Sequence, residues 1–264
     1  MKTILILLTL LLVSCAPVLG YNRTFKDVYS YKIDEGFDIE LIHARVLETG
    51  IRDIAIGTDL HSIITNQGAT VQPLLDEIKW VKKKAHAKTI WVIDYNESTR
   101  MGYEPDGVYR YYRKWEYRLD AYRAIAKEID YFIVVVGVMH YPAPSDITTY
   151  LLALNGIFRE EDVKFGVYDG DGVRDNLNYE LLAEEGIFIW SDIYIDSFSQ
   201  SAYLRSPNGW GNLVTLFYMG PGSWQFNEPE DFQLGYDLMR ENDFTGYNII
   251  LTWLYEGVMP DYYE

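Results

Sequence analysis

The chain has 264 residues, and its 39 acidic and 23 basic residues give a formal net charge of −16. Nucleic acid and anionic lipid headgroups are bound by concentrated Lys and Arg, so this charge argues against both as partners. The hydrophobic content is 48%, enough for a sizeable core, and the aromatic content of 16% includes 23 Tyr and 7 Trp. Aromatic rings suit stacking on sugars, but they also fill cores.

Residues 1–20 have the pattern of an export signal. Lys2 precedes an apolar run over residues 3–13, which is too short to span a bilayer but fits a signal-peptide core. Residues 12–15 (LVSC) resemble the lipobox of prokaryotic lipoproteins, in which Cys15 is lipidated, whereas a cut after Gly20 would give a plain secreted protein. Cys15 is the only cysteine, which favours the lipobox and leaves no disulfide. We expect an extracellular or cell-surface protein that meets the membrane only through an anchor at Cys15.

Strand-like and helix-like runs alternate through residues 21–264, the predicted mature domain. Apolar, β-branched or aromatic runs predict strands at 28–33, 51–57, 89–94, 131–139, 164–168, 187–190, 213–218 and 247–251. Helical spacing and end signals predict helices at 37–48, 73–87, 108–129, 145–158 and 232–240, and a shorter one that ends at Gly186. The apolar stripe of the 108–129 helix, which includes Tyr122, is expected to be core.

Strand candidates interleaved with helices, without a linker-like break, predict a single α/β domain with a parallel sheet. Two architectures fit this pattern, a closed (β/α)8 TIM barrel and an open doubly wound sheet. No glycine-rich phosphate loop follows the first strand, which weakens the nucleotide-binding open sheet and favours the barrel.

Acids and aromatic rings recur where the predicted strands end, which is where barrels of this kind carry their working residues. Glycoside hydrolysis needs two carboxylates that face each other across a sugar, and rings beside them hold the flanking sugars. The sequence therefore predicts a glycan as the ligand. The candidate catalytic acids are Glu256, Glu228, Asp192 and Asp169. The candidate substrate-binding residues are Asp94, His140, Tyr168, Trp190, Trp224, Trp253 and Tyr255.

Several of these residues also have a structural interpretation. Glu228 stands in the first turn of a predicted helix, Asp169 begins a glycine-containing turn, Asp94 is able to cap the next segment, and His140 is able to pack in the core. The four histidines are scattered without the spacing of metal ligands, and no Gly-x-Ser-x-Gly motif occurs. We expect neither a metal nor a cofactor.

Three segments together resemble a known family. Residues 129–142 (IDYFIVVVGVMHYP), 220–222 (GPG) and 252–260 (TWLYEGVMP) are similar, in order and approximate spacing, to segments of the endo-α-mannosidase-like glycoside hydrolases, family 99 and its relatives. The resemblance runs from about residue 89 to the end. It implies a (β/α)8 fold, action on α-linked mannose or related glycans, and a general acid/base role for Glu256.

The chain departs from the family at its last motif. Trp253 stands where the family has the first glutamate of a pair, and Leu254 replaces the motif tryptophan. Either Glu228, Asp192 or Asp169 supplies the second carboxylate, or the protein no longer hydrolyses glycans. The sequence thus predicts an exported glycoside hydrolase, with a non-catalytic carbohydrate-binding lipoprotein as the alternative. A structural cell-surface domain that binds no glycan is a third possibility.

Overall fold

Parallel strands alternate with helices in the computed structural model, which describes residues 26–33, 38–60, 71–94, 115–136, 147–169, 178–196, 201–204, 213–217, 237, 241 and 246–251. The first five strands are β1 (Lys26–Lys32), β2 (Asp53–Thr58), β3 (Thr89–Asp94), β4 (Tyr131–Val136) and β5 (Lys164–Asp169). Each pairs in parallel with the next. The helices are α2 (Ile39–Thr49), α4 (Gln72–Lys83), α6 (Trp115–Ala126), α7 (Ile147–Glu160) and α8 (Tyr179–Glu184).

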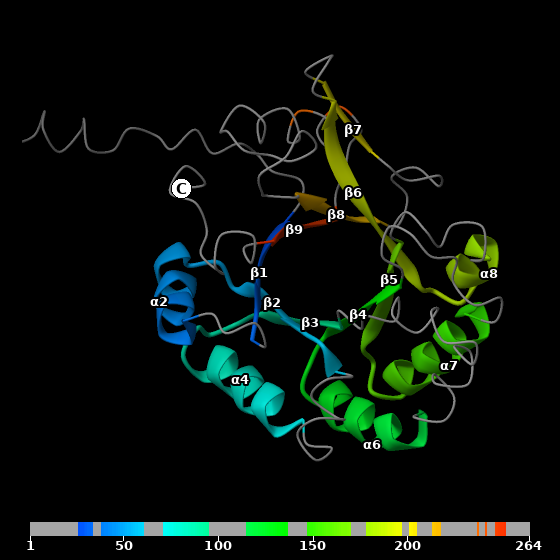
Figure 1. The fold of residues 1–264 in the computed structure, drawn as a ribbon, viewed down its shortest axis with the longest axis horizontal. Coiled ribbons are helices and arrows are strands. Elements are labelled where there is room, and N and C mark those ends of the chain that lie inside the picture. The colour runs from blue at the N-terminus through cyan, green and yellow to red at the C-terminus, as the bar shows by residue number, and fades with distance from the viewer. Residues whose placement is uncertain are drawn as a thin grey trace, which may run out of the picture.

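The later strands extend the same sheet. They are β6 (Phe188–Asp196), β7 (Ser201–Leu204), β8 (Leu213–Phe217) and β9 (Tyr247–Leu251). The strand order is β5-β4-β3-β2-β1-β9-β8-β6-β7, and β6 also pairs with β5, so the pairings of the parallel strands return to their starting point (Figure 1). β1 and β5 therefore lie on opposite sides of a ring of strands. β7 stands outside this ring as an antiparallel partner of β6.

The predicted α/β class with a parallel sheet is confirmed. The predicted strands at 89–94 and 247–251 coincide with β3 and β9, and the other strand boundaries shift by a few residues. β7 was not predicted, and β6 runs six residues past the predicted end at 190 because it continues into a hairpin with β7. Most of the predicted 232–240 helix lies outside the described residues.

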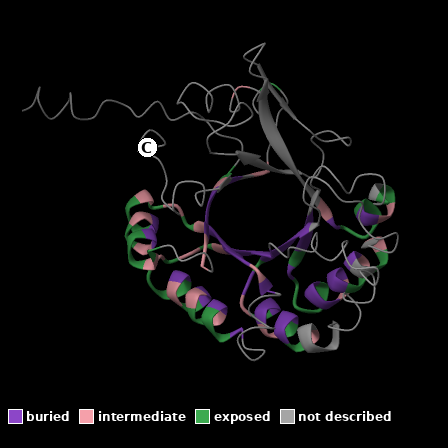
Figure 2. Ribbon diagram, in the orientation of Figure 1, coloured by how far each residue is buried: buried purple, intermediate pink, exposed green. Residues whose placement is uncertain are grey.

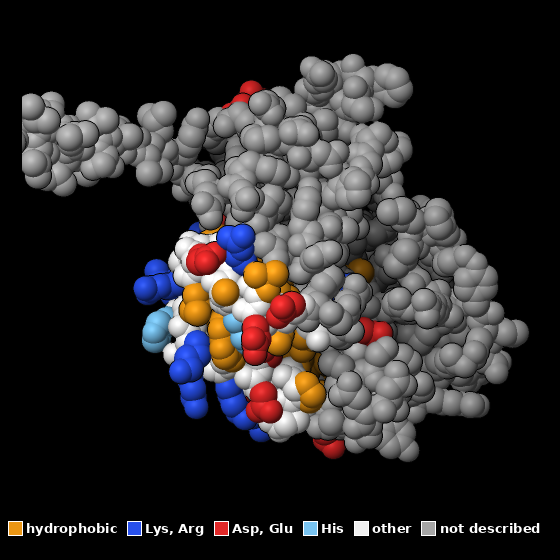
Figure 3. All heavy atoms as spheres, turned by 60° about the vertical axis from the view of Figure 1, so that its left-hand side comes forward, with side chains coloured by type: hydrophobic (Ala, Val, Ile, Leu, Met, Phe, Trp, Pro, Cys, Tyr) orange, Lys and Arg blue, Asp and Glu red, His pale blue; other side chains and the backbone are white. Residues whose placement is uncertain are grey.

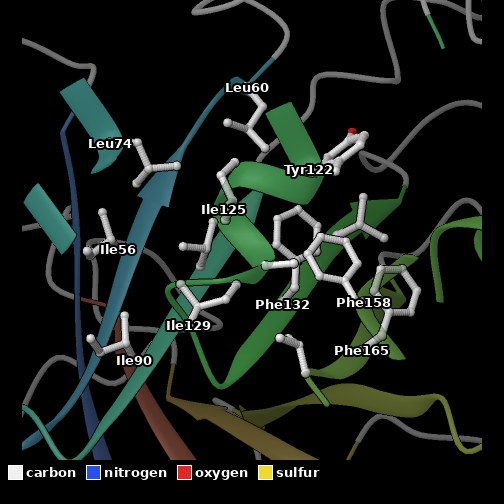
Figure 4. Close-up of a cluster of buried hydrophobic side chains, with 14 of the residues drawn as sticks. Ile56, Leu60, Leu74, Ile90, Tyr122, Ile125, Ile129, Phe132, Phe158 and Phe165 are labelled. Carbon is white, nitrogen blue, oxygen red and sulfur yellow. The ribbon is translucent and has the colours of Figure 1, made fainter. Parts of the chain in front are cut away.

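The outer face of the strands is buried against the helices, as Figure 2 shows for the purple strands and the purple sides of the helices. Phe132 of β4 stacks on Phe158 of α7 with ring centroids 4.1 Å apart, and Tyr122 of α6 meets both rings edge-on. Figure 4 shows these rings beside the aliphatic side chains of β2, β3 and α6. The expectation that Tyr122 belongs to the core is confirmed, since it is fully buried.

A polar link ties β1 to α2 and α4 within this outer layer. The Tyr31 hydroxyl donates to Glu77 Oε1 at 2.5 Å, and His43 Nε2 lies 2.7 Å from the same oxygen. The His43 ring stacks on Trp80 with centroids 3.4 Å apart. Burial, and then the Glu77 carboxylate, raise the pKa of Tyr31 well above its usual value, so the phenol remains a donor.

The surface formed by α2 and α4 is chemically mixed. Figure 3 shows hydrophobic and acidic side chains side by side on this face, with Lys and Arg around them. Leu41 and Leu47 of α2 are 44% and 52% exposed. Asp38 begins α2 by accepting the backbone N–H groups of Glu40 and Leu41. Within the described part of the chain, no helix has the length and apolar character of a membrane span.

Candidate functional site

The inner face of the strand ring is lined by a second hydrophobic cluster, separate from the one beneath the helices. Its members are Val28, Ala55, Trp91, Ile93, Tyr131, Ile133, Val135 and Ile249. Along β1 to β4 these residues alternate with residues that face the helices, as the two-residue period of a strand requires. Paired residues of neighbouring parallel strands lie on the same face. The face of any described strand position therefore follows from its partner.

Aromatic rings fill the amino end of the ring interior. Trp91 and Tyr131 stack with centroids 3.7 Å apart, and the Tyr131 hydroxyl donates to the Tyr247 hydroxyl at 3.2 Å. Lys164 Nζ donates to the Tyr131 hydroxyl at 3.4 Å. Tyr131, Lys164 and Tyr247 are the first residues of β4, β5 and β9, so they lie at one end of the sheet. We call Trp91, Tyr131, Lys164 and Tyr247 the amino-end cluster.

The Tyr247 hydroxyl of the amino-end cluster stays protonated at neutral pH. Burial, and then the hydrogen bond with Tyr131, raise the pKa of Tyr247 to about 12. Lys26 Nζ also lies 5.6 Å from the centre of the Tyr247 ring. Because these rings contact one another and the strands, they serve the packing of the fold. Part of the high aromatic content of the sequence is therefore core.

Three predicted site positions come together on β5 and β6. Tyr168 pairs with Val135 of the inner cluster on one side and with Trp190 on the other. Asp192 pairs with Leu216, which pairs with Ile249 of the inner cluster. Positions 168, 190 and 192 therefore belong to the inner face, toward the carboxyl ends of two adjacent strands. We call them the carboxyl-end positions.

Asp169 occupies the other face of β5. It pairs with Val136 and alternates with Val167, which belongs to the core beneath the helices. Because successive residues of a strand face opposite sides, position 169 lies on the outer face and position 168 on the inner face. The catalytic role predicted for Asp169 stays a prediction.

Asp94 is fully buried at the end of β3. Its Oδ1 accepts the backbone N–H of Leu60 at 3.2 Å. It pairs with Thr58 and alternates with Val92 of the outer core, so it supports the chain where it leaves β2. The contact gives Asp94 a structural role. The sequence suggested a different structural role, in which Asp94 caps the segment that follows it. Its substrate-binding role stays a prediction.

The remaining predicted site residues lie outside the described residues. They are His140, Trp224, Glu228, Trp253, Tyr255 and Glu256. Across the described ranges, no three His, Cys, Asp or Glu side chains gather in a way that would hold a metal ion.

Sequence reasoning missed one feature of the inner face. A Cβ atom on Gly166 of β5 would lie 2.2 Å from the ring of Phe188 of β6, so this position accepts only glycine while Phe188 keeps its place. A glycine inside an otherwise apolar strand signals such a close approach. The sequence KFGVYD of β5 contains that signal.

Comparisons with known proteins give no family for the chain. No family model and no curated protein matches it. Among solved structures, the chain is similar to the spore cortex-lytic enzyme SleL of Bacillus megaterium QM B1551, with a TM-score of 0.45 and 10% identity over 85% of this chain and 70% of that chain. The catalytic domain of a mannanase from Streptomyces sp. SirexAA-E gives a TM-score of 0.48 and 10% identity over 83% and 73% of the two chains.

A sugar phosphate isomerase/epimerase from Parabacteroides distasonis ATCC 8503 gives a TM-score of 0.48 and 12% identity over 85% of this chain and 86% of that chain. All three likenesses fall below a TM-score of 0.5 and carry no inference about function.

Proposed function

We propose that the chain is an exported glycoside hydrolase on a complete (β/α)8 barrel, with its substrate at the carboxyl ends of the strands. The observation that carries the proposal is the pairing of Tyr168 with Trp190, with Asp192 two residues further along β6. Two neighbouring ring positions suit the holding of a sugar, and Asp192 would supply one of the two carboxylates that its cleavage needs. The parallel strand pairings support the barrel. Barrels of this kind carry their active sites at the carboxyl ends of the strands, which supports this location for the substrate.

In this proposal Glu256 is the general acid/base and Asp192 is the second carboxylate. The resemblance of residues 252–260 to the family-99 motif supports Glu256. The inner register of β6 supports Asp192 over Asp169, whose position shares the outer face of β5 with Val167. Glu228 is the remaining candidate for the second acid.

The substrate class follows from the same resemblance. α-Linked mannose glycans or related glycans are the first to test, with His140, Trp224, Trp253 and Tyr255 as further contacts around the sugar. Neither nucleic acid nor a cofactor takes part in the proposal. Export by residues 1–20, with a lipid anchor at Cys15, completes it, and acyl incorporation that disappears in the Cys15→Ala variant would support the anchor.

The test is the release of reducing ends from a panel of α-mannan oligosaccharides and other polysaccharides. Glu256→Gln and Asp192→Asn should each lower turnover by at least about a hundredfold, because each removes a group needed in the transition state. Asp169→Asn is the matched control on the adjacent strand and should retain most of the turnover. Full activity of Glu256→Gln would eliminate the proposed acid/base.

A non-catalytic carbohydrate-binding protein is the second candidate. The observation that favours it is Trp253, which stands where the family has a glutamate. This function predicts glycan binding that Trp190→Ala and Trp253→Ala weaken, with no turnover of any substrate by the wild-type protein. Turnover that depends on Glu256 would exclude it.

A further inference from the structure

The ring of Phe188 occupies the space where a side chain at position 166 would stand. A Cβ atom on Gly166 would lie 2.2, 2.3 and 2.7 Å from three atoms of the Phe188 ring, distances that real Cβ atoms do not reach. The two residues are direct partners in the β5–β6 ladder. The ring therefore leans across β5 on the inner face, and the missing side chain of Gly166 is what admits it.

Phe188 lies between the two ends of the ring interior. On one side it makes edge-on contacts with Trp91 and Tyr131 of the amino-end cluster, with centroids 6.2 Å apart in both pairs. On the other side, the next inner pair toward the carboxyl ends is Tyr168 with Trp190. Phe188 therefore separates the packed amino end from the carboxyl-end positions.

We propose that Gly166 and Phe188 are a positioning pair, in which Phe188 forms the floor beneath the Tyr168–Trp190 pair and Gly166 fixes the height of that floor. The inference rests on the proposed function, because it gives the site a defined depth for a sugar ring. A side chain at position 166 would push the Phe188 ring toward the carboxyl-end positions or force the two strands apart. Either movement displaces Trp190 without touching the ligand.

Gly166→Ala tests this pairing against a matched control, Gly156→Ala. Gly156 lies in α7, and a Cβ atom there would meet nothing within 4 Å. The first measurement is the 19F NMR resonance of 5-fluorotryptophan at position 190, assigned with Trp190→Phe. The second is binding of an α-linked mannotetraose.

Gly166→Ala should move the Trp190 resonance and weaken mannotetraose binding roughly tenfold to a hundredfold, as small displacements of positioned groups do. The control should leave both unchanged. In the double variant Gly166→Ala with Phe188→Leu, the smaller side chain makes room for the new methyl group, so both readouts should return toward the wild-type values. A role in stability alone would lower the melting temperature and leave the resonance in place.

Three results separate the possibilities. An unmoved Trp190 resonance in folded Gly166→Ala overturns the positioning pair. If Gly166→Ala does not fold, Phe188→Leu alone decides the question, because without a methyl group at position 166 it leaves the space over Gly166 unfilled. A shifted Trp190 resonance with weaker mannotetraose binding then supports the pair, and an unchanged resonance with unchanged binding overturns it. If the wild-type protein binds neither mannotetraose nor any glycan of the panel, the proposed function fails, while the resonance still decides whether the pair sets the position of Trp190.

Discussion

The two ends of the strand ring carry the same residue types in different surroundings. At the amino end, Trp91, Tyr131 and Tyr247 contact one another. The two tyrosine hydroxyls are hydrogen-bonded to each other, and Lys164 donates to the Tyr131 hydroxyl. Toward the carboxyl end, Tyr168 and Trp190 are paired next to Asp192 at the rim of the ring. An aromatic ring whose neighbours are other rings contributes to folding, whereas in the proposed function the ring positions beside Asp192 hold a ligand. The difference teaches that location, more than composition, separates core residues from candidate site residues.

The largest loss of stability is expected when a large side chain is removed from the amino-end cluster. Trp91→Ala removes a fully buried indole that stacks on Tyr131, and large aromatic deletions of this kind cost about 3–5 kcal/mol. Denaturant unfolding followed by circular dichroism measures the loss, and Trp91→Phe is the control that keeps a ring. A loss below about 1 kcal/mol would show that the amino end is not packed as described.

Asp94→Ala should have the next largest effect. It leaves the buried backbone N–H of Leu60 without its carboxylate acceptor, which costs about 1–3 kcal/mol. Thermal and denaturant unfolding measure this change. Glycan affinity measured on the same variant separates the two roles of Asp94, since a ligand contact at the rim predicts weaker binding beyond the loss of stability.

Tyr247→Phe probes the hydroxyl chain of the amino end. Losing the hydrogen bond from Tyr131 should cost about 0.5–1.5 kcal/mol near neutral pH. The pKa of Tyr247 is raised to about 12, so its protonated phenol stabilises the fold fully below the ordinary value near 10, and this contribution is lost as pH rises through 12. The stability of Tyr247→Phe should therefore fall less steeply than that of the wild type between about pH 10 and 12. Equal slopes in unfolding curves across this range would contradict the assignment.

Trp190→Ala should have the smallest effect on stability and the clearest effect on binding. If Trp190 faces a ligand at the rim, its removal should change the free energy of unfolding by less than about 1 kcal/mol. Glycan affinity, measured by calorimetry, should fall roughly tenfold or more, as the loss of an aromatic anchor does. A stability loss as large as that of Trp91→Ala would place Trp190 with the core and erase the contrast between the two ends.

The sequence predicted much of the fold because the strands are short, continuous apolar runs between helices with clear periodicity. β3 and β9 fell at the predicted residues for this reason. The antiparallel β7 escaped prediction because its pairing depends on the hairpin that follows β6 and not on a local pattern. Long-range pairing of this kind leaves little trace in one segment.

The site was less accessible to sequence reasoning. Strand ends can be found from a pattern, but which face a residue takes depends on strand register. One residue of register separates Tyr168 on the inner face from Asp169 on the outer face. The sequence likewise could not show that the ring of Phe188 occupies the space where a side chain at position 166 would lie, since that contact joins two strands.

β6 does not stop where its neighbours stop. It is held by β8 through Ile193 and by β7 from Ile193 to Asp196, so its backbone is fastened continuously past the rim of the ring (Figure 1). A strand tethered on both sides of the rim has little freedom to tilt. The backbone of residue 192, which lies one residue before β6 changes partner from β8 to β7, is therefore held in place at the rim of the ring.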